Sequence, residues 1–340
     1  MFLDIFTLFL GLLLILLAAE GFTNGLEVFG RRFLLSQAVV GSLLAAVGTA
    51  LPETILPIVA IFFHHGKSGK DIGIGAILGA PFMLSTLAFF LVGVTVLIST
   101  LKKRRDFSIN IEYKSMKRDL SFFLPMYSLA LLSSFIDRRL VHLITSVILI
   151  FSYLLYVYRT FRCESRDIEH VEEMYLWKLF RRLKISKSKE PFVGVILTQV
   201  IGSIVVMVLG ARIFVSELEN ISLRFGMNPL LFALLIAPVA TELPEKFNSV
   251  TWTWKGKDTL AIGNITGAMV FQATFPVSVG ILFTEWEISG MAFISAVLAV
   301  FSATLVLAEL SFKKNVSPLT LLFGGLLYIF YAVTIISVNN

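Results

Sequence analysis

Hydrophobic residues along the chain gather in long runs, which short polar or charged segments separate. The pattern predicts ten membrane spans of about 18 to 30 residues each, enough to cross a hydrocarbon core of roughly 30 Å with some tilt. Their approximate limits are residues 2–27, 34–63, 72–100, 119–136, 140–158, 191–218, 229–254, 260–284, 289–310 and 317–337. Unbroken runs such as residues 140–158 favour helices over the alternating pattern of a β-barrel strand. We expect the first run to be retained as a span, because it lacks the basic segment and cleavage pattern of a signal peptide.

The composition agrees with a multi-pass protein of the cell membrane. Of the 340 residues, 56% are hydrophobic and 15% are charged, whereas soluble domains carry about 25% charged residues. Helices satisfy every backbone group internally, which the interior of a bilayer requires. The predicted fold class is therefore an all-α polytopic membrane protein, and a water-soluble enzyme is disfavoured.

Basic residues concentrate on alternate connections between the predicted spans. Of the 29 lysines and arginines, 22 follow odd-numbered spans, 6 lie on the other connections or at span ends, and Lys246 lies inside a span. The positive-inside rule then places both termini outside. Basic clusters beside spans, such as residues 102–105, are typical topology signals, and contact with anionic lipid is the alternative interpretation. We expect the lipid bilayer, and no nucleic acid, as a partner. The single cysteine, Cys163, excludes a disulfide framework and a cysteine-based metal site.

The longest polar stretch divides the chain into two halves. Residues 159–190 are expected to form a cytoplasmic connector between residues 1–158 and residues 191–340, each holding five spans. An alternative for part of this connector is a short amphipathic helix on the cytoplasmic face. Its apolar positions would be Val171, Met174, Tyr175, Leu176 and Leu179.

Three short motifs occur twice in the same order. The first motif is Gly-Thr-Ala-Leu-Pro-Glu at residues 48–53 and Ala-Thr-Glu-Leu-Pro-Glu at residues 240–245. The second is Gly-Lys-Asp, at residues 69–71 and again at residues 256–258. The third is Gly-Ala-Ile-Leu-Gly-Ala at residues 75–80 and Gly-Asn-Ile-Thr-Gly-Ala at residues 263–268. The first copy lies in spans two and three, and the second lies five spans later. Because this offset is odd, the copies cross the membrane in opposite directions. The pattern predicts two inverted five-span repeats, an architecture in which transporters bind their substrate near the midplane.

Glu53 and Glu245 lie deep in the apolar segments 43–63 and 230–254. A carboxylate at the bilayer centre costs at least about 2.5 kcal/mol on insertion scales, so such a residue faces the protein interior and has a partner. A protonated glutamate, or one that links two helices, would also meet this requirement. Because both glutamates occupy equivalent positions of a repeat, we favour an ion-binding role for the pair.

A proline precedes each glutamate. Pro52 leaves the carbonyl of Gly48 without its helical donor, and Pro244 does the same for Ala240. We therefore expect broken helices whose freed carbonyls line a cavity or bind a cation.

Carboxylates, freed carbonyls and the hydroxyls of Thr49 and Thr241 form an all-oxygen ligand set. Such ligands suit Ca²⁺ or Na⁺ and disfavour zinc and copper. The chain contains no metal-spaced histidine motif, no aspartate-rich pyrophosphate motif and no nucleophile paired with a base. We therefore expect a transporter of inorganic cations rather than a membrane enzyme.

The paired Thr-x-Leu-Pro-Glu segments, each followed by a Gly-x-Ile-x-Gly-Ala span, resemble the two α-repeats of the calcium/cation antiporter superfamily, nearest its prokaryotic sodium/calcium exchanger branch. The resemblance covers essentially the whole chain. It implies a secondary active antiporter that exchanges Ca²⁺ for Na⁺ by alternating access, with spans one and six sliding past the bundle. Glu53 and Glu245 would be the central calcium ligands, flanked by Thr49, Thr241 and neighbouring carbonyls. No tightly bound cofactor is implied, and a monomer is the expected state.

The chain departs from this family pattern at several ligand positions. The serine that usually precedes Leu-Pro-Glu is replaced by Ala50 and Glu242. The family usually has Gly-Ser-Asn in spans three and eight, followed by an Asn or Asp ligand. In the first copy this chain has Gly79-Ala80-Pro81, followed by Leu84. In the second copy it has Gly267-Ala268-Met269, followed by Gln272. Alanine and leucine side chains cannot coordinate Na⁺, whereas Glu242 adds a carboxylate that would hold a divalent ion or carry a proton. Two alternatives stay open: H⁺-coupled exchange of Ca²⁺ or another cation, and a degenerate relative that does not transport.

Overall fold

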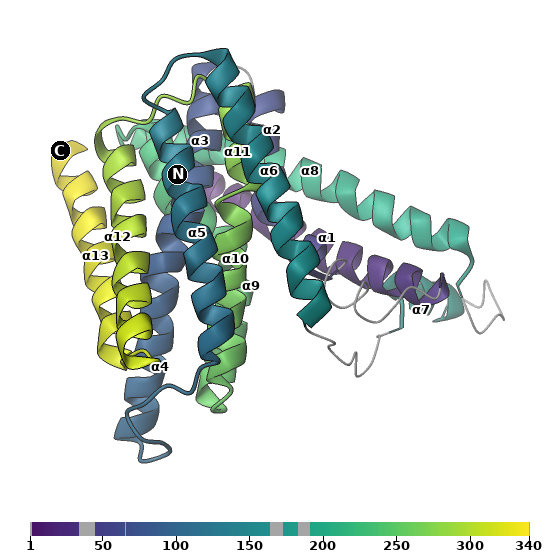
Figure 1. Ribbon diagram of the computed structural model, residues 1–340. Coiled ribbons are helices and arrows are strands. Elements are labelled where there is room, and N and C mark those ends of the chain that lie inside the picture. The colour runs from purple at the N-terminus through teal and green to yellow at the C-terminus, as the bar shows by residue number, and fades with distance from the viewer. Residues whose placement is uncertain (1, 34–44, 65, 164–172, 183–190, 340) are drawn as a thin grey trace.

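The computed structural model describes residues 2–33, 45–64, 66–163, 173–182 and 191–339 (Figure 1). Within these ranges, only the backbone is described for residues 31, 45–49, 161–163, 243–245, 336, 338 and 339. All regular secondary structure in the described ranges is helical. The elements are α1 (Phe2–Arg32), α2 (Ala45–Phe63), α3 (Lys67–Met83), the π-helical turn η2 (Leu84–Ala88), α4 (Phe89–Leu101), α5 (Tyr113–Ser133), α6 (Arg139–Cys163), α7 (Tyr175–Arg182), α8 (Val193–Arg224), α9 (Pro229–Trp254), α10 (Asp258–Gln272), α11 (Phe275–Phe283), α12 (Gly290–Lys313) and α13 (Pro318–Asn339).

Every predicted span overlaps one helix or a run of consecutive helices. Seven helical stretches in the described chain are long and apolar enough to cross a membrane, and they include the continuous stretch Lys67–Leu101. Of the second predicted span, residues 34–44 lie outside the described residues. The predicted class, an all-α multi-pass membrane protein, is confirmed.

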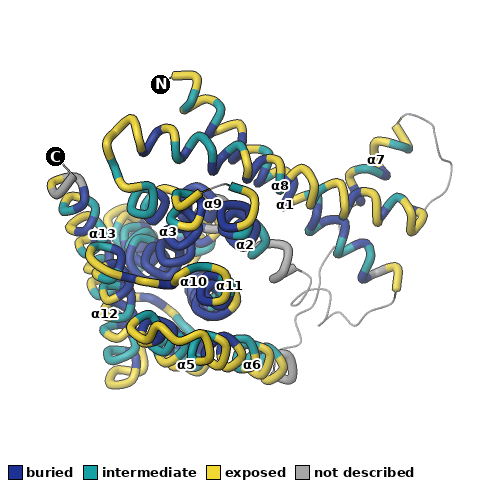
Figure 2. The backbone as a smooth tube through the Cα atoms, turned by 90° about the horizontal axis from the view of Figure 1, so that it is seen from above, coloured by how far each residue is buried: buried dark blue, intermediate teal, exposed yellow. Residues whose placement is uncertain are grey.

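Burial separates the helices into a central group and a peripheral group (Figure 2). In the most apolar segments of Lys67–Leu101 and of Asp258–Phe283, 67% of the residues are buried, against 28% in α1, 22% in α8 and 17% in α6. The peripheral helices expose large apolar side chains, such as Phe9, Leu13 and Leu209. A contiguous apolar surface of this extent is suited to lipid rather than to water. The central helices are therefore the place to look for a functional site.

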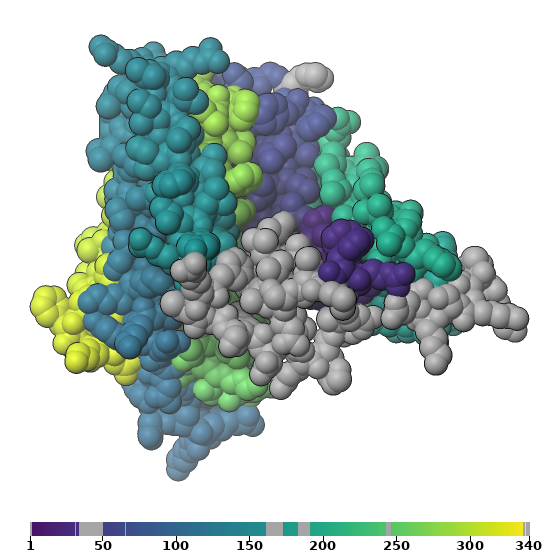
Figure 3. All heavy atoms as spheres, turned by 45° about the vertical axis from the view of Figure 1, so that its right-hand side comes forward, coloured from purple at the N-terminus to yellow at the C-terminus, as the bar shows by residue number. Residues whose placement is uncertain are grey.

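The long helices α1 and α8 pair with each other beside the remaining bundle (Figure 1). Two glycines allow the two backbones to approach closely. A Cβ atom added at Gly11 would lie 2.9 Å from the carbonyl oxygen of Gly210, and one added at Gly210 would lie 2.8 Å from that of Gly11. On the face seen in Figure 3, this pair lies on the right, with α5 and α6 on the left.

The short helix α7 lies against the α1–α8 pair. Trp177 is buried together with Met174, Val28 and Ile196, whereas Leu179 is 49% exposed. The amphipathic helix considered for the connector is therefore present, but Trp177 provides its buried anchor and Leu179 does not. Val171 lies outside the described residues.

Two glycines of the repeated Gly-x-Ile-x-Gly-Ala motif bring α3 against α9. A Cβ atom added at Gly75 would overlap the carbonyl oxygen of Leu230, and one added at Gly79 would overlap that of Leu234. The corresponding glycines of α10, Gly263 and Gly267, have no described atom within 4 Å of an added Cβ. The two copies of the motif are thus packed differently.

The expected helix breaks at Pro52 and Pro244 are wrong, because α2 and α9 continue as helices through these prolines. Each proline still lacks an N–H, so the missing hydrogen bond is absorbed without ending the helix. The irregular backbone lies instead in the partner helices. Leu84 begins the π-helical turn, and α10 ends at Gln272 before α11 begins. These two positions correspond in the two copies, and π-helical turns frequently occur at functional sites.

An ion pair fastens the α4–α5 connection to the start of α10. Arg105 donates from Nη1 to Asp258 Oδ1 at 2.7 Å and from Nη2 to Oδ2 at 2.5 Å, and the Asn110 amide donates to Oδ2 at 2.9 Å. The Asp258 side chain is fully buried, and its hydrogen bonds raise the pKa of Arg105. Arg105 therefore stabilises tertiary structure in addition to its predicted role as a topology signal.

Alanine substitution tests the different packing of the two motif copies. Gly79→Ala should lower the melting temperature and the yield of monodisperse protein, because overpacking at a backbone contact costs about 1–3 kcal/mol. Gly267→Ala should melt at or slightly above the wild-type temperature, because it meets no described atom and alanine favours a helix by about 1 kcal/mol. The measurement is thermal unfolding in detergent. Equal melting temperatures for both variants would show that α3 does not approach α9 this closely.

Neutralising Asp258 tests the Arg105 anchor. Asp258→Asn should destabilise the protein by about 3–5 kcal/mol, because it leaves a largely buried guanidinium without its carboxylate. The matched control is Asp71→Asn, which changes the corresponding aspartate of the first Gly-Lys-Asp motif. Asp71 is only partly buried and forms no ion pair with a described residue, so its loss should cost less than about 1 kcal/mol. Thermal unfolding compares the two variants, and a similar loss in both would contradict the anchoring role.

Candidate functional site

A small cavity is lined by residues of α2, α3 and α9, three helices that lie next to one another in Figure 2. The residues that line it are Glu53, Leu56, Pro57, Ala76, Ala80, Ala237, Pro238 and Thr241. The volume of the cavity is about 10 Å³, which is close to the minimum that one water molecule needs. The cavity therefore has room for one water or one small ion.

Two of the predicted ligands, Glu53 and Thr241, meet at this cavity. The Glu53 residue is 8% exposed, and Thr241 is 4% exposed. The Thr241 hydroxyl donates to the carbonyl of Ala237 at 3.1 Å, which leaves its oxygen lone pairs available to a cation. A carboxylate and a hydroxyl facing a buried cavity are hard oxygen ligands of the kind that Ca²⁺ and Na⁺ accept.

Small side chains create the room for this cavity. Ala76 and Ala80 of α3 face Ala237 of α9, and the glycines of the same α3 motif bring these helices together. The structure thus places Ala80 at the cavity wall. At this position the chain provides space instead of an oxygen ligand.

The remaining predicted ligands divide into two groups. Ala240, Glu242 and Gln272 are described and buried. For Gly48, Thr49 and Glu245, only the backbone is described, and it is helical at all three positions. Among the described residues, no group of three or more His, Cys, Asp and Glu side chains gathers to hold a metal ion.

Glu242 contacts a lysine and is not one of the residues that line the cavity. Its Oε2 atom lies 2.9 Å from Lys246 Nζ, and the two side chains are 0% and 7% exposed. A buried ion pair of this kind compensates two charges that would each be costly alone. Lys246 was expected inside a span, but not as the partner of Glu242. The signal was available, since residues four apart lie on the same face of a helix.

Gln272 ends α10 at the interruption before α11. The residue is 2% exposed, and its Oε1 atom is buried without a hydrogen-bond partner among the described residues. A buried amide oxygen without a donor is costly, and a cation or a water molecule would satisfy it. Its counterpart Leu84 is fully buried and contributes no side-chain oxygen.

A buried aspartate that the sequence analysis missed connects three helices around the central group. Asp119 of α5 accepts hydrogen bonds from Thr266 of α10 at 2.7 Å and from Tyr156 of α6 at 2.6 Å. Arg118 lies 3.1 Å from the same carboxylate. Asp119 was the first residue of a predicted span, and an acid at such a position was the signal to search for partners.

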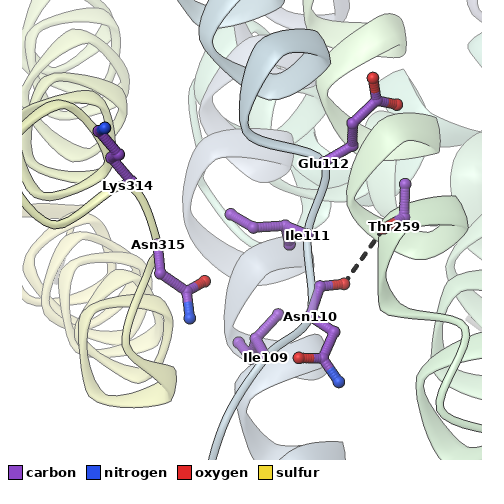
Figure 4. Close-up of a pocket in the computed structure, with 7 residues that line it drawn as sticks. All are labelled: Ile109, Asn110, Ile111, Glu112, Thr259, Lys314 and Asn315. Carbon is purple, nitrogen blue, oxygen red and sulfur yellow. Dashed lines mark hydrogen bonds between the residues drawn. The ribbon is translucent and has the colours of Figure 1, made fainter.

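A larger pocket of about 380 Å³ lies at the surface, away from the cavity (Figure 4). It is formed by the α4–α5 connection, the start of α10 and the α12–α13 turn. Thr259 donates to the carbonyl of Asn110 at 3.1 Å, and Glu112 and Lys314 are the charged residues that line the pocket. It contains none of the repeated motif residues, so the buried cavity is the stronger candidate.

Comparison with known proteins agrees with this fold. The sequence pattern of the sodium/calcium exchanger protein family matches residues 3–162 and 195–338. The chain is 22% identical over 314 residues to the inner membrane protein YrbG of Escherichia coli (strain K12). This alignment covers 92% of this chain and 89% of YrbG. It is 24% identical over 298 residues to a membrane protein of Methanocaldococcus jannaschii, over 88% of this chain and 87% of that protein.

Two solved structures share the fold. The H⁺/Ca²⁺ exchanger CAX matches with a TM-score of 0.69 at 14% identity, over 99% of this chain and 85% of that one. The sodium-calcium exchanger NCX_Mj, soaked with Na⁺ and Sr²⁺, matches with a TM-score of 0.57 at 20% identity, over 98% of both chains. With the family pattern matched over nearly its whole length, this chain belongs to the sodium/calcium exchanger family and is a multi-pass membrane protein.

Proposed function

We propose that this protein is a secondary active cation antiporter that exchanges Ca²⁺ for Na⁺ by alternating access, with Glu53 and Glu245 at a shared midplane site. The observation that carries the proposal is the buried cavity where Glu53 of α2 meets Thr241 of α9. A carboxylate is costly inside a membrane bundle, and a cation site explains why the chain retains one there. Glu245 follows on α9 four residues after Thr241 and would supply the second carboxylate.

The remaining ligands in this proposal come from the same helices. Thr49, Thr241, Gln272 and the carbonyls of Gly48 and Ala240 would complete the ion sites, and Glu242 would supply further negative charge. No tightly bound cofactor takes part, since the ions themselves are the cargo. The protein acts as a transporter rather than an enzyme and functions as a monomer.

The proposed architecture has ten spans in two inverted repeats, residues 1–158 and 191–340, with residues 159–190 as a cytoplasmic connector and both termini outside. Helix contacts that recur in the two halves support it. The contact of α3 with α12 corresponds to the contact of α10 with α5, with the two halves interchanged. In the same way, the contact of α4 with α13 corresponds to the contact of α11 with α6. The close α1–α8 pair would be the part that slides past the bundle during exchange.

Calcium as the cargo is supported by the names of the two solved relatives, one an H⁺/Ca²⁺ exchanger and the other a sodium-calcium exchanger. Their different coupling ions keep H⁺ as the alternative to Na⁺. Ala80 and Leu84 offer no side-chain oxygen for Na⁺, which favours the H⁺ alternative. A degenerate relative without transport is the third possibility, favoured by the same two residues and opposed by the retained Glu53.

Transport by reconstituted protein tests the proposed function. We expect ⁴⁵Ca²⁺ uptake into proteoliposomes to require an outward Na⁺ gradient, and to fall to the level of empty liposomes in Glu53→Gln and Glu245→Gln. The matched control is Glu287→Gln, the same change at an exposed residue after α11, which should keep wild-type uptake. Uptake that survives both site substitutions would refute the proposal. Uptake driven by a pH gradient and not by Na⁺ would assign H⁺ as the coupling ion.

Calcium binding without transport separates an exchanger from a degenerate relative. In detergent, millimolar Ca²⁺ should raise the melting temperature of the wild-type protein, because a ligand that binds only the folded state stabilises it. Glu53→Gln should lose this increase, since it removes a charged ligand. A wild-type protein whose melting temperature does not respond to 10 mM Ca²⁺ would support the degenerate reading.

A further inference from the structure

The exchange proposed above uses the charge of Glu242 but assigns no role to Lys246, with which Glu242 forms a buried ion pair. Both side chains lie inside the central bundle, with Oε2 and Nζ 2.9 Å apart and with 0% and 7% of the side chains exposed. Among the described residues, neither group has a hydrogen-bond partner outside the pair. Among the described residues, this buried acid and this buried base thus compensate only each other.

The first copy of the motif has neither charge. Aligned through Leu-Pro-Glu, Glu242 corresponds to Ala50 and Lys246 corresponds to Thr54. The Thr54 hydroxyl donates to the carbonyl of Ala50 at 2.8 Å, over the same spacing of four residues. The second copy therefore carries an acid and a base together where the first copy has a neutral pair.

The ion pair lies beside the candidate ligands. Glu242 directly follows Thr241, which lines the cavity, and Lys246 directly follows Glu245. The backbone of α9 fixes both neighbours, so the ammonium is attached to the helix that carries the proposed site. A positive charge held here occupies space and satisfies a carboxylate that a free cation would otherwise satisfy.

The physical chemistry of lysine fits this role. The ammonium is a compact charge of +1, equal to the charge of Na⁺, and it donates hydrogen bonds to oxygen ligands. Because the helix tethers it four residues from Glu242, it is always present at the carboxylate, whereas a free ion must be captured from solution. A free monovalent cation would therefore not displace it at ordinary concentrations.

We propose that the Lys246 ammonium is a tethered cation that fills, beside Glu242, a monovalent-cation subsite that would otherwise take Na⁺. The wild-type protein then binds no ion at this subsite. Replacing Lys246 with a neutral residue creates a Na⁺ site there. The inference rests on the proposed function in treating this part of α9 as the ion-binding region, but its test requires no transport.

The test compares the melting temperature in detergent as NaCl replaces choline chloride at constant ionic strength. Lys246→Met removes the charge and one heavy atom, leaving space at the position of Nζ. We expect this variant to melt well below the wild type in choline and to regain about 5 °C as Na⁺ rises to 200 mM, beyond any Na⁺ response of the wild type. Binding of ²²Na⁺ to the purified variant should increase by one ion per chain.

Two control variants assign the response to Glu242. The double variant Glu242→Gln/Lys246→Met removes the carboxylate as well, and its Na⁺ response should return to that of the wild type. Lys313→Met breaks a second lysine–glutamate pair with the same spacing and the same 2.9 Å distance, but its lysine is 69% exposed. This variant should show no added Na⁺ response, because water already compensates an exposed charge.

Three outcomes overturn the inference. One is a Lys246→Met variant whose Na⁺ response equals that of the wild type, which would make the pair a structural link only. The second is a variant that does not fold in either salt while the double variant folds, because Na⁺ would then be unable to replace the ammonium. The third is a double variant that keeps the added response, which would place the ion elsewhere. A Lys246→Met variant that folds only when Na⁺ is present supports the inference. None of these results depends on whether the wild-type protein transports Ca²⁺.

Discussion

The cost of burying a carboxylate in a membrane bundle is the constraint on which the functional part of this structure depends. Glu53 and Glu242 lie in the central helices, where water cannot solvate them, so each requires a compensating partner. The chain meets this requirement in two ways. Glu53 faces a cavity with room for one small ion, whereas Glu242 has a lysine on its own helix. In the function that we propose, the first partner is an exchangeable ion, whereas the second is a permanent one.

The two copies of the motif share a sequence pattern but differ in packing. Gly75 and Gly79 bring α3 against the backbone of α9, while Gly263 and Gly267 of α10 meet no described atom. The irregular backbone lies at corresponding positions of the two copies but differs in form. A π-helical turn begins at Leu84, whereas the helix is interrupted after Gln272. The alternating access that we propose would use this difference, because one packing arrangement would exchange with the other when the site changes its accessible side.

Local sequence signals predicted much of this structure. Apolar runs gave the helices, because a bilayer permits few alternatives for a long apolar segment. The repeated Leu-Pro-Glu motif led to Glu53 and Thr241, which the structure brings to one cavity. The expected breaks at Pro52 and Pro244 were wrong because neighbouring helices can hold a proline-containing helix together. Asp119 was missed because its partners, including Thr266, lie far away in the sequence.

The sequence by itself determined the class, the family and the carboxylates at membrane depth, because each of these depends on hydrophobicity or on a short motif. Only the tertiary structure decided which groups meet. The cavity exists because alanines of α3 and α9 face one another across a close contact, and Arg105 anchors α10 because a connection folds back onto Asp258. Hydrophobicity acts residue by residue and can be read along the chain. Close packing and charge pairing depend on distances between segments, which the sequence does not express.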